Sequence, residues 1–83
     1  MERKEIEKKV IEAASIAFKR PVNEISPSTL FVKDLHSKSV NAIKMTIILQ
    51  DQFGLAKIPF ARVVKNQTIA DAIKMVEELL AAK

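Results

Sequence analysis

Residues 31–53 read FVKDLHSKSVNAIKMTIILQDQF, and this stretch decides the fold. It begins as a polar segment, passes through Ser39 and continues into a run of apolar residues with helical spacing. Gly54 follows directly. A glycine in this position is typical of a helix end, because it adopts left-handed backbone angles without strain. We therefore expect a loop over the first part of the stretch and a helix over residues 39–53.

The expected helix over residues 39–53 has two separate apolar faces, as a rotation of about 100° per residue shows. The first face consists of Ala42, Met45, Leu49 and Phe53. The second consists of Val40, Ile43 and Ile47, with Lys44 and Asp51 beside it. We expect Met45, Leu49 and Phe53 to pack in the core, and Val40 and Ile47 to contact a partner protein.

Three further segments also have helical spacing. The first helix is expected over residues 3–19, before Pro21, because proline disfavours helical geometry in the residue that precedes it. A short third helix is expected over about residues 61–65, after Pro59, and a last helix over residues 69–82. Thr68 and Asp71 have the spacing of a capping box at the start of that last helix.

A long connection over residues 21–38 separates the first two helices. Loops of this length are uncommon in small domains and need contacts that hold them to the core. We expect Asp34 to accept hydrogen bonds from backbone donors within the loop. Five apolar side chains are expected to pack against the core: Val22, Ile25, Leu30, Phe31 and Leu35.

The composition bounds the class of protein. A chain of 83 residues with 48% hydrophobic content is expected to form a single domain over residues 1–83. Without cysteine and with one histidine, it has no disulfide, thiolate or histidine-rich metal site. No apolar run approaches the roughly 18 residues of a membrane span, and the charged beginning does not fit a signal peptide. We expect a cytoplasmic monomer that does not insert into membranes.

The formal net charge of +4 is spread along the chain. Residues 1–20 carry +2, residues 21–53 are balanced and residues 54–83 carry +2. Because acidic and basic residues are mixed, this pattern indicates a solvated surface more than a nucleic-acid patch. No nucleic-acid partner is expected.

The spacing around Ser39 resembles the signature of the acyl carrier protein family. That signature is a phenylalanine, then Asp-Leu-Gly-x-Asp-Ser-Leu, then a helix that ends in phenylalanine. His36 and Lys38 depart from it, replacing the glycine and the aspartate, and Val40 replaces the leucine. The matching positions are Phe31, Asp34, Leu35, Ser39 and Phe53, and the resemblance extends to Ile58-Pro59 and to the spacing of Thr68 and Ile73.

The resemblance implies an all-α fold, a bundle of three longer helices and one short third helix with a long first loop. It implies a carrier and not an enzyme. Ser39 would carry 4′-phosphopantetheine, added by a phosphopantetheinyl transferase, and acyl groups would be held on the arm as thioesters for acyl-transferring or acyl-activating enzymes. Such a phosphoprotein would serve lipid metabolism, for example fatty acid biosynthesis. The candidate acyl-pocket residues are Ile43, Met45, Leu49, Phe53 and Ile73, and the candidate partner-facing residues are Lys38, Val40, Asn41, Lys44 and Ile47.

The basic charge distinguishes this chain from the usual acidic carriers, and it favours a specialised lipid or secondary-metabolite pathway. Two other interpretations stay open. The first is a carrier-fold interaction subunit that is never modified, with Ser39 serving only as a helix cap. The second is a small basic nucleic-acid-binding domain, which is disfavoured because no helix clusters lysines and stacking aromatics are lacking. The acyl group, the pathway and the modification of Ser39 beside Lys38 and His36 are left open by the sequence.

Overall fold

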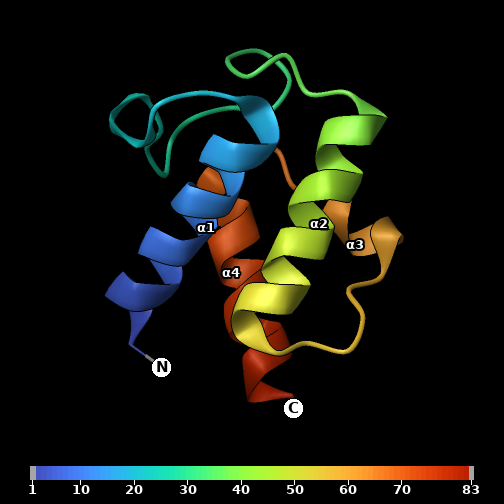
Figure 1. Cartoon of the computed structure of the whole chain (residues 1–83). Coiled ribbons are helices and arrows are strands. Elements are labelled where there is room, and N and C mark those ends of the chain that lie inside the picture. The colour runs from blue at the N-terminus through green and yellow to red at the C-terminus, as the bar shows by residue number, and fades with distance from the viewer. Residues whose placement is uncertain (1, 83) are drawn as a thin grey trace.

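The computed structural model of the chain describes residues 2–82. Its elements follow the order α1 (Arg3–Phe18), a 3₁₀ turn η1 (Val22–Glu24), α2 (Ser39–Phe53), α3 (Phe60–Val63) and α4 (Ile69–Ala81). The long first loop crosses one end of the bundle, α1 runs opposite to α2 and α4, and the short α3 lies beside α2 (Figure 1). The predicted all-α arrangement of three longer helices and one short one is confirmed.

The core forms where α1 packs against both α2 and α4. The apolar stripe of α1 includes the small residues Ala13, Ala14 and Ala17, which allow neighbouring helices to approach closely. The α4 stripe adds Ile69, Ile73 and Val76. Burial of these side chains supplies most of the driving force for folding, because apolar area removed from water is the dominant favourable contribution.

Helix α2 buries one of its two apolar faces, as the spacing predicted. Met45, Leu49 and Phe53 are buried, with 2–5% of each residue exposed. Val40 is 68% exposed and Ile47 is 59% exposed. Gly54 ends the helix in the left-handed conformation, with a φ of 62°.

The first loop is held to the core by side chains and by backbone hydrogen bonds. Ile25, Phe31 and Leu35 are buried as expected, and Leu30 is half-buried. The prediction for Val22 is wrong: it lies in the 3₁₀ turn and is 50% exposed. The Leu30 N–H donates to Asp34 Oδ2 at 2.8 Å, which confirms the role expected for that carboxylate.

Backbone hydrogen bonds also join the first loop to the segment before α4. The Phe31 N–H donates to the Gln67 carbonyl at 3.0 Å, and Leu30 and Thr68 form an isolated antiparallel bridge. Within residues 2–82, no helix combines the length and the apolar character that a bilayer crossing requires.

Candidate functional site

Ser39 is the first residue of α2, and its side chain is exposed. Lys38 precedes it with extended backbone angles, φ −122° and ψ 167°, as expected for a residue that caps a helix. The Lys38 N–H donates to Asn41 Oδ1 at 3.2 Å, and Asn41 Nδ2 donates to the Ala17 carbonyl at 3.0 Å. Asn41 therefore fixes the start of α2 against the end of α1.

The first backbone N–H groups of α2, those of Ser39 and Val40, have no hydrogen-bond acceptor within residues 2–82. A lysine side chain has no acceptor atom, so Lys38 cannot accept a hydrogen bond from the first turn. The N–H groups of Ser39 and Val40, together with the positive end of the helix dipole, favour an anion beside Ser39.

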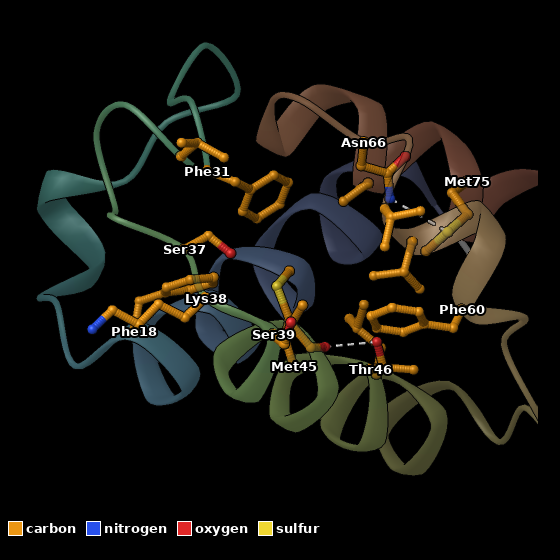
Figure 2. A pocket seen from close by; sticks show the side chains of 16 residues that line it. Phe18, Phe31, Ser37, Lys38, Ser39, Met45, Thr46, Phe60, Asn66 and Met75 are labelled. Carbon is orange, nitrogen blue, oxygen red and sulfur yellow. Dashed lines mark hydrogen bonds between the residues drawn. The ribbon is translucent and has the colours of Figure 1, made fainter.

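A cavity of about 240 Å³ opens next to Ser39. Figure 2 shows Ser37, Lys38 and Ser39 at one end of it, with Met45 and Thr46 along α2 and Phe60 and Met75 across the hollow. The Nζ atom of Lys38 points away from the cavity (Figure 2). The lining is mostly apolar and comes from the loops and all four helices: Phe18, Phe31, Val32, Ala42, Met45, Leu49, Phe60, Val63, Val64, Ala72 and Met75.

Few polar atoms face the interior of the cavity. The Thr46 hydroxyl donates to the Ala42 carbonyl at 2.7 Å, so its hydrogen is already used within α2. Asn66 Nδ2 lies 3.4 Å from the sulfur of Met75, which accepts only a weak hydrogen bond. The cavity therefore suits an apolar group that enters from the side of Ser39.

The arrangement does not resemble a hydrolytic or metal site. No hydrogen bond joins His36 to Ser39 in the part of the chain that the structure describes. Residues 2–82 also contain no group of three or more His, Cys, Asp or Glu side chains placed to hold a metal ion.

Comparison with known proteins finds chains of similar sequence. No protein-family model matches the chain. It is 29% identical over 77 residues to the acyl carrier protein of Lactobacillus acidophilus, an alignment that covers 93% of this chain and 95% of that protein. It is 26% identical over 68 residues to the acyl carrier protein of Helicobacter hepaticus, covering 82% and 83% of the two chains. Over most of its length the chain is therefore similar to acyl carrier proteins.

This similarity agrees with the residues around Ser39, and acyl carrier proteins are carriers and not enzymes. His36 stands where the family signature has glycine, and it adopts the left-handed conformation with a φ of 54°. A residue with a Cβ atom is strained there by about 1–2 kcal/mol. The loop before Ser39 thus has a histidine at a position whose backbone conformation suits glycine.

The predicted partner-facing residues of this chain lie mainly on the outside of α2. Lys38, Val40, Lys44 and Ile47 are exposed. Asn41 is half-buried, and both of its hydrogen bonds stay within the protein. The expectation that Asn41 is an exposed position is wrong, because its amide joins α2 to α1.

The predicted acyl-pocket residues divide into two groups. Met45 and Leu49 line the cavity. Phe53 and Ile73 are buried in the core and Ile43 is 49% exposed, and these three do not line it. The sequence-based search missed Phe60 and Met75, whose positions across the cavity depend on how α3 and α4 pack. A methionine two positions after Ile73, at the edge of the α4 stripe, was the available signal for Met75.

Proposed function

We propose that Ser39 is the attachment site of a 4′-phosphopantetheine arm and that the protein carries acyl groups bound to this arm. One observation carries the proposal: the exposed Ser39 hydroxyl lies at the mouth of an apolar cavity. A phosphopantetheinyl transferase would be its first partner, and acyl-activating and acyl-transferring enzymes would follow in the cytoplasm.

The residues around Ser39 fit the arm. Its phosphodiester is an anion, and the unpaired N–H groups of Ser39 and Val40 at the start of α2 favour negative charge. The exposed ammonium of Lys38 adds positive charge nearby. When attached, the arm supplies a thiol on which an acyl group is held as a thioester.

The cavity offers the acyl group shelter from water. Met45 and Leu49 form its α2 wall, and Phe31, Phe60 and Met75 contribute from the loop, α3 and α4. Removing an apolar chain from water is favourable by about 0.8 kcal/mol for each CH₂ group. The chain's own side chains thus bind and cover the cargo, and they do no chemistry on it.

The charges around Ser39 support a specialised pathway of lipid or secondary metabolism. Enzymes that recognise acidic carriers meet Lys38 and Lys44 on the exposed side of α2 instead. Like charges across an interface slow association and suppress wrong partners. We therefore expect this carrier to be served by its own set of enzymes.

Intact-mass analysis tests the attachment. The purified chain, incubated with coenzyme A and a permissive phosphopantetheinyl transferase, should gain one phosphopantetheine group. Ser39→Ala should abolish the gain. Ser37→Ala is the matched control, because Ser37 lies two residues earlier at the same cavity, and it should leave the gain intact. Modification that persists in Ser39→Ala contradicts the assignment, and absence of modification with every transferase favours an unmodified interaction subunit.

A further inference from the structure

When the chain is divided after residues 30 and 67, its net positive charge falls in the middle segment of the fold. Residues 31–67 hold six Lys or Arg against two Asp, a surplus of four. Residues 1–30 hold six against five and residues 68–83 hold two against three, so these parts cancel. The segment from the end of the first loop through α2 and α3 therefore carries the whole surplus, while the +1 of the region that contains α1 offsets the −1 of the region that contains α4.

Within residues 2–82, the lysines of this segment form no ion pair. Its two aspartates are Asp34, which accepts a hydrogen bond from the loop backbone, and Asp51 on α2. The ion pairs found within residues 2–82 are Arg3–Glu77, Arg20–Glu24 and Arg62–Glu78. Five exposed lysines therefore form no ion pair there: Lys33, Lys38, Lys44, Lys57 and Lys65.

Exposed apolar side chains gather in the same segment. Besides Val32 in the first loop, which is 73% exposed, five side chains are 45–68% exposed, and we call these five the outer patch: Val40, Ile43 and Ile47 of α2, Phe60 of α3, and Val64 directly after it. At about 100° per residue, Ile43 falls between the outward ridge of α2 and the side that lines the cavity. Phe60 and Val64 also line the cavity, so the outer patch borders its mouth.

We propose that the outer patch docks a partner protein whose contact surface has an apolar centre rimmed by Asp and Glu. Exposed apolar residues surrounded by charge mark interaction surfaces in soluble proteins, and complementary potentials set the choice of partner. The proposal rests on the proposed function in one respect: such a partner would act on cargo delivered at Ser39. The docking itself does not require that Ser39 be modified.

A second copy of the chain and a membrane are the alternative occupants of this surface. A second copy of the chain would bring an equally basic segment against this one, and the two would repel each other. An anionic membrane would also attract the lysines, and the vesicle measurement below distinguishes it from a protein partner.

The test uses the Ser39→Ala protein labelled with ¹⁵N, so that failure of attachment cannot affect it. The probe is a synthetic amphipathic helical peptide with an apolar face flanked by glutamates, and the matched probe has lysines in their place. We expect chemical-shift changes centred on Val40, Ile47 and Phe60 with the glutamate peptide only. The affinity should fall as salt rises, because exposed charges are screened over about 10 Å at 0.1 M ionic strength.

Charge reversal locates the contribution of the lysines. Lys38→Glu with Lys44→Glu should weaken binding of the glutamate peptide by about tenfold or more. The control is Lys4→Glu with Lys8→Glu, which makes the same charge change at exposed positions of α1, and it should change the affinity by less than about twofold. Equal binding of the two peptides, shifts centred on α1 or α4, or binding only to vesicles that contain an anionic phospholipid would each overturn the proposal.

Discussion

Helices α4 and α2 begin in different ways. At the start of α4 every early N–H group has an acceptor: Ile69 donates to the Thr29 carbonyl at 3.0 Å, Ala70 to the Pro27 carbonyl at 2.9 Å and Asp71 to Thr68 Oγ1 at 3.2 Å. The Asp71 carboxylate accepts in return from the Gln67 and Thr68 N–H groups. The predicted capping box is confirmed, and it also joins α4 to the first loop.

The start of α2 has only half of this arrangement. Asn41 accepts from the Lys38 N–H in the way that Asp71 accepts from Thr68, but Lys38 cannot accept a hydrogen bond in return. The two helices also differ in how much apolar surface they bury: α4 buries its apolar stripe, while α2 leaves a second apolar face exposed. The comparison shows that α4 is built for stability and that α2 keeps polar donors and apolar surface open beside Ser39.

The largest expected change in the free energy of unfolding distinguishes buried apolar residues of α4 and α2 from the exposed apolar face of α2. Ile73→Ala in α4 and Leu49→Ala in α2 each leave a hole in the core, and each should lower the free energy of unfolding by about 2–5 kcal/mol. Val40→Ala, on the exposed face, should change it by less than about 0.5 kcal/mol. Urea unfolding measures all three. Comparable losses at Val40 and Leu49 would show that α2 has no open face.

The next largest change in the free energy of unfolding, about 1 kcal/mol, is expected at the N-cap residues of α4 and α2, Thr68 and Lys38. Thr68→Ala removes an acceptor and should destabilise the protein by about 0.5–2 kcal/mol. Lys38→Ala removes none and should have little effect. Lys38→Asp supplies the missing acceptor and should raise the free energy of unfolding by about 0.5–1 kcal/mol. A loss of stability on Lys38→Ala as large as that on Thr68→Ala would contradict the comparison.

The sequence predicted the helices well because their ends are chemically marked. Pro21, Gly54, Pro59 and Thr68 stop or start helices through their own backbone or side-chain properties, and α2 spans residues 39–53 as expected. The partition of the α2 faces followed from spacing alone. These signals are local, so no knowledge of the tertiary fold was needed.

The features that the sequence did not predict depend on distant partners. Asn41 was expected at the surface, because nothing near it in the sequence indicates a buried partner. The carbonyl that accepts its amide hydrogen belongs to Ala17, 24 positions earlier. The bonds that tie the first loop to the start of α4 are backbone bonds and have no residue signature. The cavity beside Ser39 is likewise lined by segments from α1 to α4, so only part of its lining could be named in advance.

A smaller effect is expected at His36, three residues before Ser39. Its left-handed conformation suits glycine, which loses more chain entropy on folding but pays no steric cost. His36→Gly should therefore raise the free energy of unfolding by up to about 1 kcal/mol. His36→Ala is the matched control, since it removes the imidazole but keeps the Cβ atom, and it should give no gain. Equal stabilisation by both variants would locate the effect in the imidazole.

The smallest effect should appear at low pH and only at the start of α4. The Gln67 and Thr68 N–H groups donate to the Asp71 carboxylate and lower the pKa of Asp71 below its usual value, which is about 4. A carboxyl with a lowered folded-state pKa contributes stability above the unfolded pKa, and this contribution is lost as the pH falls through the folded pKa. The urea midpoint of the natural chain should therefore decline more steeply below about pH 4 than that of Asp71→Asn. Asp51→Asn, which changes an exposed carboxylate on α2, is the control and should keep the natural slope. If Asp71→Asn also keeps that slope, the ionised form of Asp71 does not stabilise the start of α4. The starts of α4 and α2 would then differ in stability only through the Thr68 side chain.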